Sequence, residues 1–164
     1  MLQELRTIEL PIPGPAGGGE KCYGFFFPDY GAGPFHTAKD LEAWFNNRLQ
    51  LCKKLERVAE GIPAFQVEKL VMAHMDPHCH NIIIDRDGRP WLIDWESAGA
   101  FQPYLEKANL LHVRDRGGHP EFQQQLHDAI SDEAPTDAQY IALLEEMTFA
   151  FTTGAMACRP DLEE

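Results

Sequence analysis

Four polar side chains in the middle of the sequence have the types and order that phosphoryl transfer requires. His74, Asp76 and Asn81 form the pattern H-x-D-x-x-x-x-N, and Asp94 follows two short apolar runs. Phosphoryl transfer needs a carboxylate beside the accepting hydroxyl and oxygen ligands that hold magnesium against the nucleotide phosphates. Asp76 fits the first requirement, and Asn81 and Asp94 fit the second. Pro77 disfavours helical dihedrals at the residue before it, so this stretch is predicted to be a loop.

The elements that must position these side chains are two short strands. Residues 82–84 are three isoleucines, which predict a short buried strand. Asp87 and Gly88 favour a tight turn, and residues 91–93 resume the apolar run. We therefore expect a β-hairpin, with the two candidate magnesium ligands at its open end and the catalytic loop beside them.

This loop and the Ile-Asp-Trp-Glu end of the second strand resemble the aminoglycoside phosphotransferase and choline kinase family, which has a protein-kinase-like fold. The resemblance implies that Asp76 is the catalytic base, with His74 supporting the loop, and that Asn81 and Asp94 bind magnesium. It also implies ATP and Mg²⁺ as cofactors. Ile93-Asp94-Trp95 stands where a protein kinase has Asp-Phe-Gly, and this departure favours a small-molecule substrate over a protein.

The resemblance extends over residues 5–115, and Gly33-Pro34-Phe35, Ala98-Gly99 and Pro103-Tyr104 resemble the fungal branch of the family. It predicts an α+β fold that is mainly α: a kinase-like C-terminal lobe with a catalytic loop and one hairpin. Residues 1–36 are expected to be an inter-lobe segment with a Pro/Gly-rich loop, and residues 37–164 a single C-lobe domain.

A complete kinase of this fold has an N-terminal lobe whose strand lysine and covering loop grip the phosphates. No strand with a central lysine precedes His74, and Lys21 follows a Pro/Gly run. We therefore expect the N-lobe to be absent and phosphoryl transfer to be impaired, unless a protein partner supplies or replaces that lobe. The alternative is a non-catalytic pseudokinase module that binds a partner or ligand.

The acceptor site is indicated by two carboxylates. Glu96 and Glu106 could present negative charge to an amine-bearing substrate. The alternative makes Glu96 a buried hydrogen-bond acceptor and Glu106 a solvated helix carboxylate.

Two other kinds of site compete with this interpretation. A zinc site is conceivable because metal-binding side chains crowd the loop, namely His74, Asp76, His78, Cys79 and His80. Pro77 argues against the continuous helix that the His74–His78 spacing would need, so His78, Cys79 and His80 are expected to be mere spacers. The run from Gly14 to Gly19 approaches a Walker A loop, but Glu20 stands where lysine is required.

Composition narrows the choice of partners. The chain has 164 residues and a net charge of −12, which argues against nucleic acid or an anionic membrane as a partner. A small-molecule substrate is more compatible with that charge. The four cysteines have no paired spacing, and no signal-peptide or membrane-spanning run is visible, so a reducing cytoplasmic setting is expected.

The remaining segments are predicted to be mainly helical. Thr37 and Asp40 form a capping box that opens a helix ending near Gly61. Residues 5–10 are expected to be a short strand, and the Pro/Gly run after them an irregular loop. Further helices are predicted over 103–113, from Pro120 to about Ile130, and from Thr136 or Asp137 onward. The expected core includes the aromatic run 23–27 and the face of the last helix, formed by Tyr140, Leu144, Met147 and Phe151.

Overall fold

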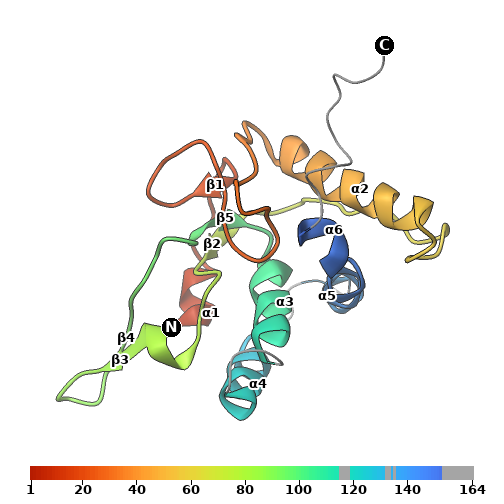
Figure 1. The fold of residues 1–164 in the computed structure, drawn as a ribbon. Coiled ribbons are helices and arrows are strands. Elements are labelled where there is room, and N and C mark those ends of the chain that lie inside the picture. Colours follow the sequence, from red (N-terminus) through yellow and green to blue (C-terminus); the bar gives the residue numbers. More distant parts are fainter. Residues whose placement is uncertain (115–118, 132–133, 135, 153–164) are drawn as a thin grey trace.

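The computed structural model describes residues 1–114, 119–131, 134 and 136–152. These residues form helices and short antiparallel strands, in keeping with the expected α+β class. The elements are α1 (Leu2–Leu5), β1 (Gly14–Pro15), α2 (Ala38–Lys54), β2 (Val71–Ala73), the 3₁₀ turn η1 (Cys79–Asn81), β3 (Ile82–Ile84), β4 (Pro90–Leu92), β5 (Gly99–Phe101), α3 (Pro103–Arg114), α4 (Pro120–Ala129), α5 (Asp137–Glu146) and α6 (Thr148–Thr152). Hairpin β3–β4 lies at the opposite end of the molecule from α2 (Figure 1).

Two small sheets flank the candidate catalytic loop, residues 74–81. One has the strand order β1-β5-β2, and the other is the β3–β4 hairpin. Gly14 pairs with Ala100 and Pro15 with Gly99, so part of the Pro/Gly run is a strand and the expectation of an entirely irregular loop was wrong. Gly99 permits this pairing because any Cβ there would collide with the carbonyl oxygen of Gly14.

The capping box at the start of α2 is confirmed. The Thr37 side chain accepts a hydrogen bond from Asp40 N, and Asp40 Oδ2 accepts one from Thr37 N at 2.8 Å. The predicted end of this helix was wrong. The helix stops at Lys54, Leu55 is the C-cap, and Glu56 has a φ of 56°, which the right-handed helix cannot accommodate.

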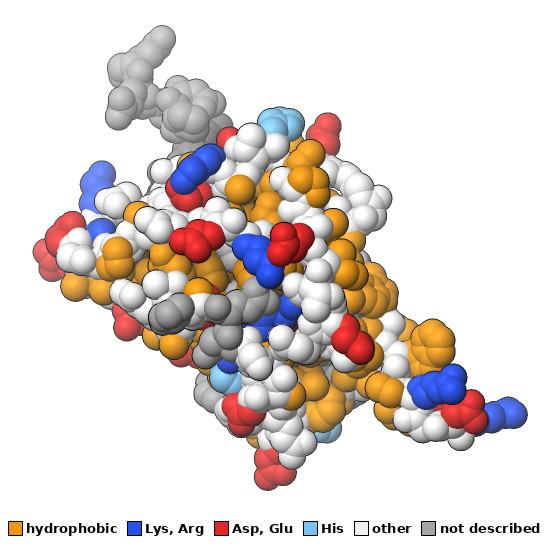
Figure 2. Space-filling model, turned by 180° about the vertical axis from the view of Figure 1, so that it is seen from behind, with side chains coloured by type: hydrophobic (Ala, Val, Ile, Leu, Met, Phe, Trp, Pro, Cys, Tyr) orange, Lys and Arg blue, Asp and Glu red, His pale blue; other side chains and the backbone are white. Residues whose placement is uncertain are grey.

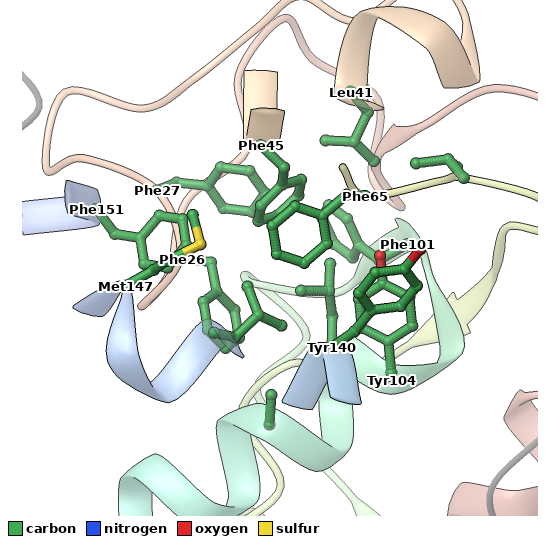
Figure 3. Packing of buried hydrophobic residues seen from close by; sticks show 14 of the residues in the cluster. Phe26, Phe27, Leu41, Phe45, Phe65, Phe101, Tyr104, Tyr140, Met147 and Phe151 are labelled. Atoms are coloured by element: carbon green, nitrogen blue, oxygen red, sulfur yellow. The ribbon is translucent and has the colours of Figure 1, made fainter. Parts of the chain in front are cut away.

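The core is rich in aromatic rings (Figure 3). Phe45 lies within 5.1–6.3 Å, between ring centroids, of Phe27, Trp44, Phe65 and Phe151. Most of the predicted core positions are buried, namely Phe26, Phe27, Tyr140, Leu144, Met147 and Phe151, but Tyr23 is 49% exposed, so placing the whole run 23–27 in the core was wrong. Helices α5 and α6 are separate because the chain turns at Met147.

The other predicted elements have mixed outcomes. Helix α3 begins at Pro103 and α4 has Pro120 at its first turn, as expected. The strand predicted over residues 5–10 is absent there: α1 ends at Leu5, and Glu9 only forms an isolated bridge with Val71. Predictions for residues 115–118, 132–133, 135 and 153–164 lie outside the described residues. Within the described part, no helix has the length and apolar character to cross a membrane.

The β3–β4 hairpin is confirmed, with Ile82 opposite Leu92 and Ile84 opposite Pro90. Its predicted burial was wrong, because Ile83 is 52% and Ile84 61% exposed. The hairpin projects as a narrow arm with hydrophobic side chains along it and charged ones at its tip (Figure 2). Its two strands pair only with each other. At the base of the hairpin, Leu92 packs against a small buried cluster that includes Leu110, whereas the outer part of the hairpin is exposed.

Candidate active site

The candidate catalytic loop is organised around a contact between Asn81 and Asp76. Asn81 Nδ2 donates to the backbone oxygen of Asp76 at 3.0 Å and to its carboxylate Oδ2 at 2.9 Å. Asn81 is buried, whereas the Asp76 side chain is 39% exposed. The amide nitrogen therefore fixes the carboxylate, and the amide oxygen of Asn81 is the atom that could bind a metal.

Asp94 is connected to the same loop through the backbone. Ile93 N donates to the Asn81 carbonyl oxygen at 3.0 Å, so the residue after it lies at the open end of the hairpin, beside the loop. Asp94 is exposed and has a φ of 62°, while Met75, just before Asp76, has a φ of 64°. Left-handed backbone at non-glycine residues is costly and clusters at functional sites. Both strained positions here adjoin the candidate acidic groups.

His74 is completely buried and connects the loop to the strand end. Its Nε2 lies 3.0 Å from the Ile93 carbonyl oxygen, and its Nδ1 accepts a hydrogen bond from Asp76 N at 3.3 Å. This pairing requires a neutral ring with the proton on Nε2. Burial lowers the pKa of His74 and favours that neutral form, although the Ile93 carbonyl and the charges of Asp76 and Asp94 partly oppose the shift.

Two polar side chains of α3, Glu106 and Asn109, form hydrogen bonds with the backbone of the loop. Glu106 Oε1 accepts from His74 N at 2.7 Å and from Met75 N at 3.3 Å, and Asn109 Nδ2 donates to the Met75 carbonyl oxygen. Burial raises the pKa of Glu106, and the two backbone hydrogen bonds partly offset this effect. Since all three partners are backbone groups, α3 sets the conformation of the chain immediately before Asp76.

The two carboxylates predicted to contact the acceptor, Glu96 and Glu106, differ in burial. Glu106 has no exposed surface, so it cannot contact an incoming substrate directly, and its oxygen is already engaged by the loop. Glu96 is exposed on the segment that follows Asp94. The alternative had made Glu96 the buried residue and Glu106 the solvated one, and the structure reverses it.

Sequence reasoning missed two side chains near the candidate base. Asn109 is buried on α3, where its i, i+3 spacing from Glu106 was the only available sign. His78 was expected to be a spacer, yet its Nε2 lies 3.4 Å from Asp76 Oδ2. Nothing in the H-x-D-x-x-x-x-N spacing distinguishes His78 from the other spacer positions, because only the folded loop turns it back toward Asp76.

The donor set fits magnesium and a nucleotide. Asp76, Asn81 and Asp94 offer oxygen atoms alone, and the latter two adjoin the same end of the hairpin. Magnesium prefers one or two protein oxygens, with the rest of its shell from water and substrate phosphates. The exposure of Asp94 leaves room for such a shell.

Comparison with known families gives one match. Residues 24–141 match the phosphotransferase enzyme family (APH), and this range includes the whole of the loop, the hairpin and α3. No curated protein and no solved structure matches the chain. Because the matched range covers more than half of the sequence, the chain belongs to the phosphotransferase enzyme family.

Proposed function

We propose that this protein transfers the γ-phosphoryl group of ATP to a hydroxyl of a small molecule, with Asp76 as the base and Asn81 and Asp94 as magnesium ligands. The observation that carries the proposal is the double connection of Asn81. Its side chain holds the Asp76 carboxylate, and its backbone oxygen accepts from the residue before Asp94. A base and two metal ligands are thereby held as one unit, as positioning for phosphoryl transfer requires.

Each protein group has a defined part in the proposed reaction. The Asp76 carboxylate accepts the proton of the substrate hydroxyl as the new oxygen–phosphorus bond forms and the bond to ADP breaks. Neutral His74 and Asn81 hold Asp76 in place throughout. Bound magnesium would neutralise charge on the phosphates, and Asn81 and Asp94 would hold it.

The acceptor is proposed to carry an amine. Glu96 is exposed and follows Asp94 by two residues, and the chain has a net charge of −12. Both features favour a cationic small molecule over an anionic one. Glu106 takes no part in this contact and acts on the reaction only through the backbone of His74 and Met75.

The groups that bind the triphosphate are proposed to come from a protein partner, which supplies or replaces the N-lobe of this kinase-like C-lobe. Lys21, which lies in the Pro/Gly-rich region, donates instead to the carbonyl oxygen of Tyr30 at 3.0 Å. A missing phosphate donor costs about 3 kcal/mol of transition-state stabilisation. We therefore propose that the chain alone transfers phosphate poorly, and that it works in the cytoplasm, where ATP and magnesium are abundant.

Calorimetry of ATP binding with and without magnesium tests the proposal. Binding should require magnesium and should weaken at least about tenfold in Asp94→Ala, since loss even of an outer-shell metal contact has that effect. Asp87→Ala is the matched control, because this exposed carboxylate lies in the hairpin turn, away from the open end. Absence of binding at millimolar ATP would reject a nucleotide site in the chain alone and favour the non-catalytic module.

A further inference from the structure

We propose that Cys79, His80 and His119 bind a zinc ion, which joins the catalytic loop to the start of α4. One ligand atom from each residue, the sulfur of Cys79 and a ring nitrogen of each histidine, lies within 4.8 Å of the other two. The proposal stands on these side chains alone and does not depend on the phosphotransferase reaction.

The loop conformation creates this cluster. Cys79 and His80 are consecutive, but the tight η1 turn lets both reach toward His119, the residue before α4. The rings of His80 and His119 meet edge to face with centroids 5.6 Å apart. Tetrahedral zinc with sulfur and nitrogen ligands requires separations of about 3.4–3.6 Å. Closing from the present spacing needs side-chain movements of roughly 1 Å, which the exposed histidines can make.

Gln123 is an independent indication of a ligand at this place. It lies one turn into α4, lines the same cavity as Cys79, His80 and His119, and is only 2% exposed. Its Oε1 is buried and has no hydrogen-bond partner among the described residues. Buried acceptors are almost always paired. A zinc-bound water, or the remote N–H of a zinc-bound histidine, is a donor of the kind this oxygen lacks.

The ligand chemistry selects zinc over magnesium. A thiolate and two imidazoles match the sulfur and nitrogen preference of zinc, with the fourth position left for water. Cys79 is a half-buried free thiol and can supply the thiolate. The zinc site weighed from the sequence is different and is not formed, because both ring nitrogens of His74 are engaged by Ile93 and Asp76. The oxygen-only set nearby would hold the magnesium instead.

Zinc at this site would connect the loop to α4. Cys79 and His80 lie between Asp76 and Asn81, and His119 is the N-cap of α4, which packs on α3. The ion would therefore tie the spacer positions of the catalytic loop to the helical body. These positions lack a direct hydrogen bond to α4 among the described residues.

Cobalt substitution tests the site in the full chain. After treatment with a chelator, titration with Co²⁺ should give a thiolate-to-cobalt charge-transfer band that saturates at one equivalent and is displaced by Zn²⁺. Cys79→Ser should abolish the band, and His119→Ala should weaken Co²⁺ binding by at least about tenfold. His36→Ala, which removes an exposed histidine far along the chain, should leave the titration unchanged.

Further variants separate this site from its alternatives. Gln123→Leu should weaken binding by about tenfold while the band remains, as expected for a group that contacts the ligand shell. Asp94→Ala should have no effect on the band. The proposal is overturned if wild type gives no band, if the band survives in Cys79→Ser, or if Asp94→Ala abolishes it. The last result would show that Asp94 takes part in holding the ion, so the ligand set would differ from the one proposed.

Discussion

The aromatic core is stabilised by packing of apolar rings, whereas the candidate catalytic loop is held by hydrogen bonds to its backbone. In the core, Phe45 is surrounded by rings from α2, from α6, from the segment before α2 and from the segment after it. In the loop, a few directional hydrogen bonds to Glu106, Asn109 and Asn81 fix the backbone. The outer part of the hairpin beyond it is exposed. We therefore expect substitutions in the aromatic core to lower the free energy of unfolding most, and substitutions around the loop to displace the candidate site residues.

Phe45→Ala should have the largest effect on stability. Phe45 is 1% exposed and touches four aromatic neighbours, so its removal leaves a cavity and should cost about 3–5 kcal/mol of unfolding free energy. That is a large part of the roughly 5–15 kcal/mol of a typical domain. Urea denaturation measures it.

Ile84→Ala is the matched control for this comparison. The same kind of truncation at a 61% exposed position of the hairpin should change stability by no more than about 0.5 kcal/mol. Equal losses in the two variants would contradict the division between a stabilising core and an exposed arm.

Glu106→Leu should have the next largest effect, although it removes no large apolar surface. It leaves the buried N–H groups of His74 and Met75 without their acceptor, at a cost of about 2–4 kcal/mol. Glu106→Gln keeps an oxygen in that place and should restore most of the stability. Magnesium-dependent ATP binding should follow the same order. A loss as large in the Gln variant would assign the effect to the charge and not to the acceptor.

The pH dependence of stability should reveal the buried carboxyl. Because burial raises the pKa of Glu106 above its ordinary 4.5, the unfolded chain releases this proton first as pH rises. Glu106 therefore contributes stability below about pH 4.5 that is lost as pH rises through the folded-state pKa. The stability of wild type relative to Glu106→Gln should fall over that window. A difference that stays constant with pH would contradict the assignment.

Local patterns predicted much of the fold because they depend on neighbouring residues. The capping box at Thr37, the helix start at Pro120 and the turn at Asp87 are all fixed by contacts within a few residues. The end of α2 was misplaced because apolar spacing continued to Ala59, whereas the chain turns at Glu56 to let the next segment return. The strand pairing at Gly14 depends on a partner far along the chain, which no local pattern contains.

Long-range contacts also limited what could be predicted about the site. Asp76, Asn81 and Asp94 were recognisable because their spacing is short and their residue types are restrictive. The burial of Glu106 depends on α3 packing beneath a loop some thirty residues earlier in the chain. The zinc cluster needs His119, which is forty residues from Cys79 in the sequence and meets it only in the folded chain. The isoleucines of β3 favoured a buried strand, and this prediction failed because strand propensity does not report whether other elements cover the strand.

Trp91→Phe should have the smallest effect on stability of the variants considered, because it removes one hydrogen bond at the exposed end of the hairpin. Trp91 Nε1 donates to Asp85 Oδ2 at 2.9 Å, and this hydrogen bond is the main reason that the pKa of Asp85 lies below its ordinary 3.8. Without it, the pKa of Asp85 should rise toward 3.8, while the Arg89 and Asp87 backbone N–H groups keep part of the shift.

The sign of this effect and its control can both be measured. A depressed carboxyl pKa contributes stability that is present above pH 3.8 and is lost as pH falls through the folded-state value, so Trp91→Phe should lose a little stability at neutral pH and none in strong acid. Carboxyl NMR titration of Asp85 reads the pKa directly. Trp95→Phe is the control, since Trp95 Nε1 donates to the Leu92 carbonyl oxygen and not to a carboxylate. A shift of Asp85 in that variant would show that the two ends of the hairpin are coupled, and the arm would then belong to the positioning apparatus of the loop.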